Sequence, residues 1–397
     1  MNRHHTAPAS TTDGLSQDDI RAVCANITKQ ISREYMAECS RARETPKELW
    51  RVMRETGLFG IGVSAEYGGL GGHLTEVALA LELLGQGGLM PFRFVTTQMA
   101  RTTLRHHGTP EQKARYLVPA AAGEITFAFA LTEADAGTNS FNIRTYAERQ
   151  PDGDYVVNGA KMWITGMHET DWAILITCTS RYDPATKKSG FSVFIVDPKS
   201  AGITLVPIDI SLHMADRSWE VHFDNLRVAA ENMIGEEGRG MEALFDCIIP
   251  ERLLAAGLNV DLSTFVLNKT AAFARQRAPF GEPIGKYQGV HIPMAEALAL
   301  TEGARALAYQ ACAKFDAQID SGMESGMESD MARFLSAEAY LKAADLAMNT
   351  HGGAATDMQQ DVIPLYLYAK FQSIAPINRN VCLAAIAQRE FGFPKSY

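Results

Sequence analysis

Two neighbouring segments of the chain combine hydroxyl, amide and indole side chains in a way that suits one large, planar ligand with phosphate groups. The first segment, residues 131–140, contains a polar turn with a single glycine, where consecutive backbone N–H groups can point at an anion. The second segment, residues 158–165, follows a tight turn and alternates apolar and polar residues like a half-buried strand. The alternative interpretation of the same residues is an ordinary β-hairpin with a polar turn.

Two later segments have the chemistry of a dinucleotide site. Arg277 precedes Phe280 and a glycine turn, with Gln288 downstream. An arginine can hold a diphosphate through two parallel hydrogen bonds, while the aromatic ring contacts an adenine. Further along, Gly352 and Gly353 would let the backbone approach the same ligand closely, although a glycine pair alone is weak evidence.

These four segments, in this order and spacing, resemble the acyl-CoA dehydrogenase family, and the resemblance covers the chain from residue 15 onward. It implies FAD as the cofactor. In the family, residues of the first two segments contact the flavin and its pyrophosphate, and here these are Phe129, Leu131, Thr132, Gly137, Thr138, Trp163 and Thr165. Trp163 and Thr165 would lie at the flavin ring, where a donor near N5 stabilises the reduced form, and Thr138 would also contact the CoA. Without the surrounding motif, Trp163 would be interpreted as a core residue of a strand.

The resemblance also implies a homo-oligomer, with a tetramer as the family precedent. The family residues equivalent to Arg277, Phe280 and Gln288 bind the FAD of a neighbouring subunit, and the 349–353 segment approaches that dinucleotide. The chain has Asn349 where the family usually has the longer Gln. Two further asparagines, Asn378 and Asn380, replace the usual flavin-contacting Thr and Gln and can still form hydrogen bonds.

A catalytic base is the remaining requirement, because removing an α-proton from an acyl thioester needs a carboxylate in a dry pocket, with its pKa raised towards neutrality. Most members place this glutamate near the C-terminus, where this chain has Pro376. A minority, isovaleryl-CoA dehydrogenase among them, carries the base on a helix directly before an arginine, and Glu251 followed by Arg252 matches that position. The alternative is a solvated surface Glu–Arg pair. The family often has Asp two residues earlier, where this chain has Ile249.

Two arginines are candidates for binding the substrate. Arg252 adjoins the expected base, and Arg93 falls in the region where family members line the acyl pocket. A buried arginine at position 93 would select an acyl chain that ends in a carboxylate. A solvated side chain, or an ion pair with an internal acid, is the alternative for Arg93.

Three functions compete on these observations. The first is FAD-dependent α,β-dehydrogenation of an acyl-CoA to a 2-enoyl-CoA, with Glu251 as the base and electron-transfer flavoprotein as the acceptor. The second is a non-oxidising family member, of the desulfinase or enoyl-CoA reductase type, acting on a short acyl-CoA that is anionic if Arg93 faces it. The third, a flavin monooxygenase of the same fold, leaves Glu251 and the CoA-contacting turn unexplained.

The composition agrees with a soluble globular enzyme. The 397 residues are 46% hydrophobic and 21% charged, enough for two or three domains with cores of their own. A net charge of −9 argues against nucleic acid or an anionic membrane as a partner. The six cysteines are scattered and fit no metal-ligand spacing, and no signal-peptide h-region is present, so we expect reduced thiols, no metal and a cytoplasmic location.

Hydrophobic periodicity predicts the elements that position these residues. After a disordered tail (1–14), residues 15–123 have a helical pattern, with a capping box at Ser16 and a buried helix over 75–86. Residues 124–236 have a period of two, which predicts a small β-barrel or sandwich, and residues 237–397 return to long helices that predict a four-helix bundle. The fold class is therefore a multidomain α+β protein in the domain order of the acyl-CoA dehydrogenase fold. The strands are predicted over 155–157, 172–177, 191–196, 203–208 and 219–223, and the C-terminal helices over 240–274, 287–321, 329–351 and 378–391.

Overall fold

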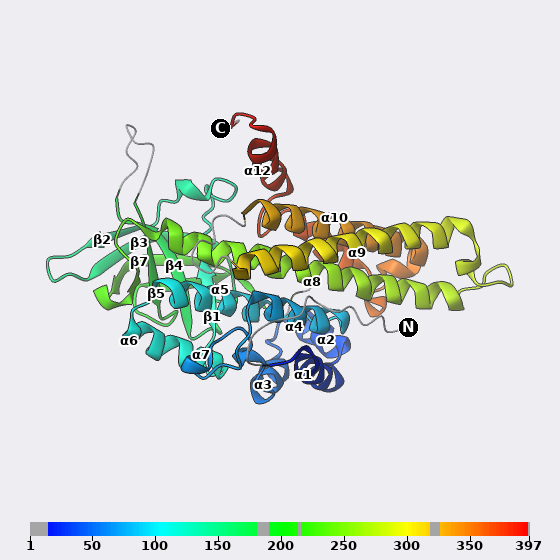
Figure 1. Cartoon of the computed structure of the whole chain (residues 1–397), viewed down its shortest axis with the longest axis horizontal. Coiled ribbons are helices and arrows are strands. Elements are labelled where there is room, and N and C mark those ends of the chain that lie inside the picture. Colours follow the sequence, from blue (N-terminus) through cyan, green and yellow to red (C-terminus); the bar gives the residue numbers. More distant parts are fainter. Residues whose placement is uncertain (1–14, 181–189, 213, 215, 318–325, 396–397) are drawn as a thin grey trace.

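The computed structural model describes residues 15–180, 190–212, 214, 216–317 and 326–395, so the predicted tail lies outside the described residues. Figure 1 shows three parts in the predicted order: N-terminal helices in blue, a β-rich part in green, and long C-terminal helices from green to red. This arrangement confirms the predicted fold class.

The N-terminal part is helical, as predicted. Its main helices are α1 (Gln17–Gln30), α2 (Arg33–Ala42), α3 (Lys47–Glu55), α4 (Leu74–Gln86) and α5 (Phe92–His107), followed by the short α6 (Pro110–Gln112) and α7 (Val118–Ala121). The Ser16 hydroxyl accepts a hydrogen bond from the Asp19 N–H at 3.2 Å, and the Asp19 carboxylate accepts one from the Ser16 N–H, which confirms the capping box. Helix α4 is buried on almost every side because its residues are nearly all apolar.

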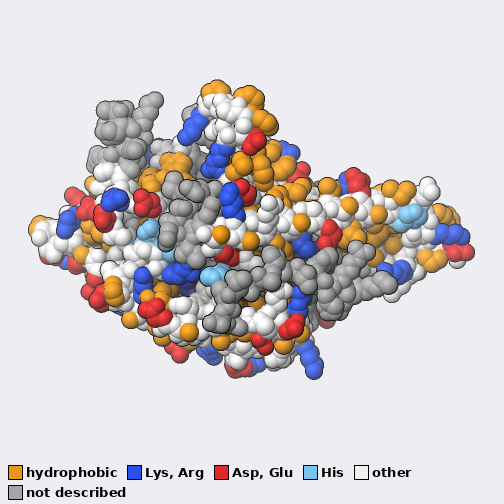
Figure 2. Space-filling view, viewed as in Figure 1, with side chains coloured by type: hydrophobic (Ala, Val, Ile, Leu, Met, Phe, Trp, Pro, Cys, Tyr) orange, Lys and Arg blue, Asp and Glu red, His pale blue; other side chains and the backbone are white. Residues whose placement is uncertain are grey.

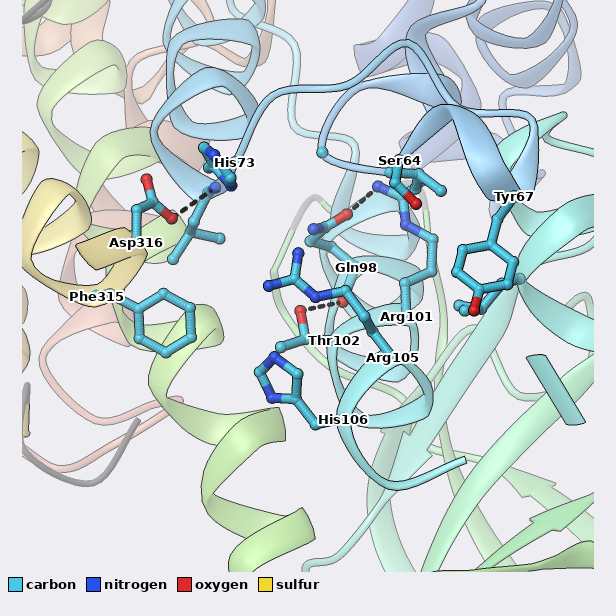
Figure 3. Close-up of a pocket in the computed structure, with 14 residues that line it drawn as sticks. Ser64, Tyr67, His73, Gln98, Arg101, Thr102, Arg105, His106, Phe315 and Asp316 are labelled. Carbon is cyan, nitrogen blue, oxygen red and sulfur yellow. Dashed lines mark hydrogen bonds between the residues drawn. The ribbon is translucent and has the colours of Figure 1, made fainter. Parts of the chain in front are cut away.

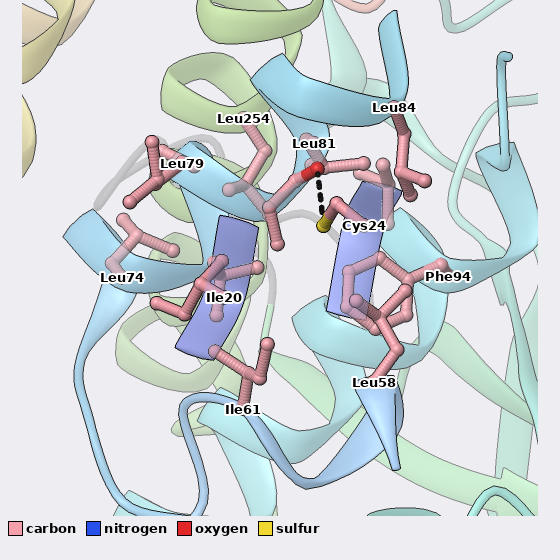
Figure 4. Packing of buried hydrophobic residues seen from close by; sticks show 14 of the residues in the cluster. Ile20, Cys24, Leu58, Ile61, Leu74, Leu79, Leu81, Leu84, Phe94 and Leu254 are labelled. Atoms are coloured by element: carbon pink, nitrogen blue, oxygen red, sulfur yellow. Dashed lines mark hydrogen bonds between the residues drawn. The ribbon is translucent and has the colours of Figure 1, made fainter. Parts of the chain in front are cut away.

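The N-terminal core includes a residue from the C-terminal part. Figure 4 shows Ile20, Leu79 and Phe94 packed together with Leu254, which lies more than 150 positions after the last of them in the sequence. The helix that carries Leu254 therefore belongs to two hydrophobic cores at once, and the N-terminal and C-terminal helices cannot move independently without exposing apolar surface.

The middle part is a sheet of eight strands: β1 (Phe127–Ala130), β2 (Tyr146–Arg149), β3 (Tyr155–Thr165), β4 (Trp172–Cys178), β5 (Phe191–Val196), β6 (Ile203–Pro207), β7 (Ser218–Val228) and β8 (Met233–Ile234). The strand order is β6-β7-β3-β2-β4-β5-β8, with β1 paired in parallel to β4. All five predicted strands are present. The strands that the prediction missed, β1, β2 and β8, have four residues or fewer, too short for a clear alternation.

The C-terminal part consists of α8 (Gly240–Gln276), α9 (Gln288–Ala317), α10 (Gly326–His351), α11 (Ile363–Gln372) and α12 (Arg379–Phe391). The long helices α8, α9 and α10 pack along one another, whereas α12 projects from the bundle (Figure 1). Apolar side chains gather on this projecting part in Figure 2. Phe391, the last residue of α12, and Phe393 just beyond it are exposed. Helix α11 was not predicted. Among the described residues, no helix has the length and apolarity needed to span a membrane.

Candidate active site

A buried ion pair joins the first two predicted segments. The Lys161 ammonium, on β3, lies 2.9 Å from the Glu133 carboxylate and donates to the Leu131 carbonyl at 2.8 Å. Glu133 also accepts hydrogen bonds from the backbone N–H groups of Arg144 and Thr145. Burial lowers the pKa of Lys161 to about 8 against the opposing effect of Glu133. The polar turn is therefore fixed onto the strand by a fully hydrogen-bonded charge pair.

Trp163 presents its indole to solvent from the middle of this arrangement. Its side chain is 53% exposed, although its neighbour Ile164 is buried. The residue also has φ 65°, a left-handed conformation that is rare for a bulky side chain, at a register irregularity between β3 and β7. The core-residue interpretation of Trp163 is wrong. An exposed aromatic ring on a strained backbone is typical of a ligand-binding position.

The other residues of the first segment lie around the same place. Thr132 accepts a hydrogen bond from the Met162 N–H at 2.8 Å through its carbonyl, and Thr165 at the end of β3 is partly exposed. Gly137 and Thr138 are exposed, and a Cβ atom at Gly137 would meet no protein atom within 4 Å. The turn thus leaves open space in front of its backbone, where a ligand could lie.

The expected base lies on α8, a helix that shares a hydrophobic cluster with this turn. Phe129 and Leu131 pack in one hydrophobic cluster with Cys247 and Ile248, which precede Glu251 by about one helical turn. The Glu251 side chain is surrounded by protein atoms, although the residue keeps a small accessible surface. Burial raises the pKa of Glu251 to about 7, in spite of the neighbouring positive charges of Arg252 and Arg333. The carboxylate therefore has the near-neutral pKa that a general base needs.

Arg333, on α10, connects Glu251 to the segment where most family members carry their base. The guanidinium is fully buried and donates to the carbonyl of Gln372, to its side-chain amide oxygen at 3.1 Å, and to the Ala375 carbonyl at 2.6 Å. Ala375 precedes Pro376. The structure thus brings the C-terminal segment close to Glu251, with a proline in the place of the usual glutamate. We name the group of Thr132, Trp163 and Glu251 the inner half-site.

The remaining dinucleotide residues form a second group at the far end of α8. Arg277, Phe280 and Gln288 are exposed, Phe280 by 82%. The ring of Phe273 stacks on His351 at 4.2 Å, which brings the 349–353 segment to the same end of the bundle. We name this group, defined by Arg277, Phe280, Asn349, Gly352 and Gly353, the outer half-site.

The two half-sites of one chain are too far apart to hold one cofactor. Arg277 directly follows the end of α8 and lies 26 positions after Glu251, so at 1.5 Å per residue along this continuous helix the two are separated by roughly 40 Å. In the outer half-site, Gly352 has φ 59°, which glycine adopts at no cost, and a Cβ atom at Gly352 or Gly353 would meet open space. The side chain of Asn349 is exposed and donates to Asp345 at 3.1 Å.

Asn378 and Asn380 start helix α12. The Asn378 side-chain oxygen accepts a hydrogen bond from the Asn380 N–H at 2.9 Å and caps the helix. That acceptor is therefore engaged within the chain, whereas the Asn380 side chain is exposed. A role of these two residues at the flavin stays a prediction.

The structure gives both candidate substrate-binding arginines internal partners. Arg252 is paired with the buried carboxylate of Asp330 at 2.9 Å. Arg93 lies between Glu169 and Asp216, at 3.7 Å from each, and its guanidinium stacks over Trp50 at 4.2 Å.

For Arg93 these contacts match the stated alternative of an ion pair with an internal acid, and a role in substrate binding stays a prediction. Arg93 borders an open cleft of about 400 Å³ between α3 and the middle part. Two carboxylates already face the Arg93 guanidinium, which weakens the argument that it binds an acyl carboxylate. Arg252 is likewise neutralised, by Asp330, which argues against direct substrate binding. Another cavity, shown in Figure 3, lies between residues 62–67, α5 and the end of α9 and holds about 30 Å³, room for about one water molecule and not for an acyl chain.

Sequence reasoning missed the residues that hold the site together. Lys161 and Glu133 both lie inside the quoted segments, but a charged residue in an alternating strand is normally assigned to the solvent face. Arg333 lies 82 positions after Glu251, and helical periodicity alone cannot show what its side chain meets. The only available signal was its position within a helix of small apolar residues.

Comparison with known proteins covers all three parts of the chain. Residues 15–124 match the model of the acyl-CoA dehydrogenase N-terminal domain, residues 128–226 that of the middle domain, and residues 238–391 that of the C-terminal domain. Together these matches cover most of the 397 residues.

Individual relatives agree with this assignment. The chain is 31% identical over 380 residues to acyl-CoA dehydrogenase FadE12 of Mycobacterium tuberculosis, covering 95% of this chain and 96% of the relative. It is 28% identical over 370 residues to a 3-(aryl)acrylate reductase of Clostridium sporogenes, covering 92% and 93%. The solved structure of butyryl-CoA dehydrogenase from Megasphaera elsdenii superposes with a TM-score of 0.88 at 25% identity, covering 96% of this chain and all of the other. The chain belongs to the acyl-CoA dehydrogenase family, whose members are FAD-dependent oxidoreductases that act on acyl-CoA.

Proposed function

We propose that the protein catalyses the α,β-dehydrogenation of an acyl-CoA thioester to a 2-enoyl-CoA, with Glu251 as the catalytic base. The observation that carries this proposal is the environment of Glu251. Its carboxylate is enclosed by protein atoms and has a pKa raised to about 7 by burial. It lies on α8 about one turn beyond Cys247 and Ile248, which belong to the same hydrophobic cluster as Leu131. A carboxylate with this pKa can accept an α-proton near neutral pH.

The residues of the inner half-site fit a flavin. The exposed indole of Trp163 offers a planar surface, Thr165 and the polar turn offer hydrogen-bond donors, and the backbone at Gly137 faces open space. FAD bound there supplies the acceptor for the β-hydride. Glu251 takes the α-proton, so that the two C–H bonds of the substrate are replaced by a Cα=Cβ double bond. We infer that the electrons pass on to electron-transfer flavoprotein.

We further propose that the protein works as a homo-oligomer, in which the outer half-site of one chain completes the inner half-site of another. The separation of roughly 40 Å along α8 rules out one cofactor bridging both groups of the same chain. The exposed ring of Phe280 and the open backbone at Gly352 and Gly353 support a ligand-binding role of the outer half-site. A tetramer follows the family precedent.

An anaerobic absorbance titration tests the reaction. The purified flavoprotein is titrated with short, branched, long and dicarboxylic acyl-CoAs, and we expect one class to bleach the flavin band. The matched variant Glu251→Gln keeps shape and volume but cannot accept a proton, and should lower the rate of bleaching by about 10²- to 10⁴-fold while the protein stays yellow. Full activity in Glu251→Gln would exclude Glu251 as the base.

Reduction of an enoyl thioester is the second candidate. It is favoured by the relative named 3-(aryl)acrylate reductase, together with the loss of the usual glutamate at Pro376. In this direction a protonated Glu251 would donate to Cα. Reoxidation of the chemically reduced flavoprotein by enoyl-CoAs, with no bleaching by any saturated acyl-CoA, would establish this function in place of dehydrogenation. The internal partners of Arg93 weaken the argument for an anionic substrate.

A further inference from the structure

Two adjacent histidines at the end of α5 converge on one carboxylate of α8. The Nδ1 atom of His106 lies 2.9 Å from Oδ2 of Asp246, and the Nε2 atom of His107 lies 2.7 Å from the same oxygen. The three atoms lie within 4.8 Å of one another, and Figure 3 shows His106 on the last turn of α5. Neighbouring helical residues diverge by about 100°, so this convergence requires the two rings to use different nitrogens.

The donor set has the chemistry of a transition-metal site. Imidazole nitrogens suit Zn²⁺ and its neighbours in the first transition series, whereas Mg²⁺ and Ca²⁺ prefer all-oxygen ligands. Three protein ligands with an open fourth position form a common zinc arrangement. In a tetrahedral zinc site, ligand atoms are separated by roughly 3.3 Å, so each nitrogen would have to move away from the Asp246 oxygen by about 0.5 Å. The two nitrogens themselves lie no more than 4.8 Å apart.

The cluster lies at the edge of the core. The side chains of His106 and His107 are 18% and 23% exposed, whereas Asp246 is buried, with 13% of its side chain exposed. The neighbouring Cys247 is unsuited as a fourth ligand, because its thiol is buried and forms a contact of 2.7 Å with the Thr103 hydroxyl. The fourth position is therefore left to water.

We propose that His106, His107 and Asp246 form a binding site for one divalent transition-metal ion of the Zn²⁺ class. The ion would join the end of α5 to α8, five residues before Glu251, and so fix the two helices at the wall of the active site. The inference is independent of the reaction proposed above, since it rests on ligand geometry alone. It also differs from the sequence prediction of no metal, because His107 and Asp246 are 139 positions apart and no ligand spacing shows at that distance.

The test uses the full-length flavoprotein, without an affinity tag and after treatment with a chelator. Zinc binding is measured by competition with a chromophoric chelator, and Co²⁺ is added separately to record its visible absorption. Asn and Gln place an amide N–H near the positions of Nδ1 and Nε2 respectively, so His106→Asn and His107→Gln keep a hydrogen bond to Asp246 but lose a metal ligand. His222→Gln is the matched control, since His222 faces only one carboxylate, that of Glu220 at 3.0 Å.

We expect the wild type and His222→Gln to bind one equivalent of Zn²⁺ at this site, with a Co²⁺ spectrum of low coordination number and no competition from Mg²⁺. Each ligand variant should weaken binding by at least about tenfold. Equal affinity in all four proteins would overturn the proposal, because it would place the ion elsewhere, for example at the N-terminal His4 and His5, which every variant retains. Absence of binding in the wild type would show that the cluster is held by hydrogen bonds alone.

Discussion

A buried ion pair stabilises the inner half-site, whereas the residues of the outer half-site are exposed on the surface of the same chain. Lys161 and Glu133 fix the turn beside Trp163 in the interior, but Arg277 and Phe280 have no such support. The inner half-site is therefore ordered by folding. In the outer half-site, the backbone conformation of Gly352 and one exposed hydrogen bond, from Asn349 to Asp345, fix the geometry. On our proposal, the side chains of the outer half-site become ordered when they contact another chain and its cofactor.

The largest expected effect comes from breaking the charge pair of the inner half-site. Lys161→Met leaves the Glu133 carboxylate buried without its partner, which should lower the free energy of unfolding by about 3–5 kcal/mol. The comparison variant is Lys286→Met, in the exposed segment that follows Phe280 of the outer half-site, where the pair of Lys286 with Glu282 at 3.7 Å should be worth no more than about 1 kcal/mol. Urea denaturation of both variants measures the difference. Similar losses would show that the two regions are not built differently.

The second effect is the pH dependence that Glu251 confers on the inner half-site. Burial raises its pKa from 4.5 to about 7, so between these values the folded protein keeps a proton that the unfolded chain has lost. The contribution of Glu251 to the free energy of unfolding should therefore fall as the pH rises from about 4.5 to about 7, by at most about 3 kcal/mol. Denaturation curves of the wild type and Glu251→Gln measure this, and the variant should lack that fall.

Catalysis should show the opposite trend, because the base must be ionised. Below about pH 7 the rate of substrate-dependent bleaching should rise roughly tenfold per pH unit and then level off. A rate that does not change with pH across this range would show that the reaction does not require ionised Glu251.

A mixture of two variants tests whether the half-sites of different chains combine. Arg277→Ala should weaken FAD binding by about 1.5–3 kcal/mol, the usual value of a hydrogen bond to a charged group, with little change in the stability of the chain. Chains carrying Arg277→Ala and Glu251→Gln are co-refolded in equal amounts. Roughly a quarter of the sites then combine an intact inner with an intact outer half-site, so activity should exceed that of either variant alone. If the mixture shows no recovery of activity, the two half-sites do not combine to bind one FAD.

The smallest effect is expected at Asn349. Replacing it with the longer Gln that the family usually has should extend the amide beyond its contact with Asp345 and strengthen FAD binding by up to about 1 kcal/mol. Equilibrium dialysis of the flavin measures the change. Asn349→Ala is the control and should shift the affinity in the other direction or leave it unchanged.

Much of the fold could be predicted because long elements leave a clear period. The buried helix over 75–86 and the strand that contains Trp163 both follow from alternation or near-continuous apolarity. Strand β1 is only four residues long, and α11 has ten residues with a proline in its first turn, so neither gives a readable pattern.

The site could be predicted less completely, because its properties depend on contacts between distant segments. Glu251 could be located by its position before an arginine, but its raised pKa depends on how the surrounding helices enclose it. The partners of Arg93, Glu169 and Asp216, come from parts of the chain more than 70 positions away, and no spacing in the sequence reveals them. The residue types therefore indicated which side chains could take part in catalysis or binding. Tertiary packing determines which of them are already engaged by internal partners.

On our proposal, the length of helix α8 sets the distance between two active sites of the oligomer. The helix carries the base of one active site near its beginning and, at its end, an arginine for the next. Inserting a single residue between Glu251 and Arg277 would rotate the far end by about 100° and lengthen it by about 1.5 Å, while an insertion of four would nearly restore the rotation but add about 6 Å. On our proposal, each active site takes its base from α8 of one chain and its Arg277 from α8 of another. The number of residues between positions 251 and 277 is therefore constrained more tightly than their identity.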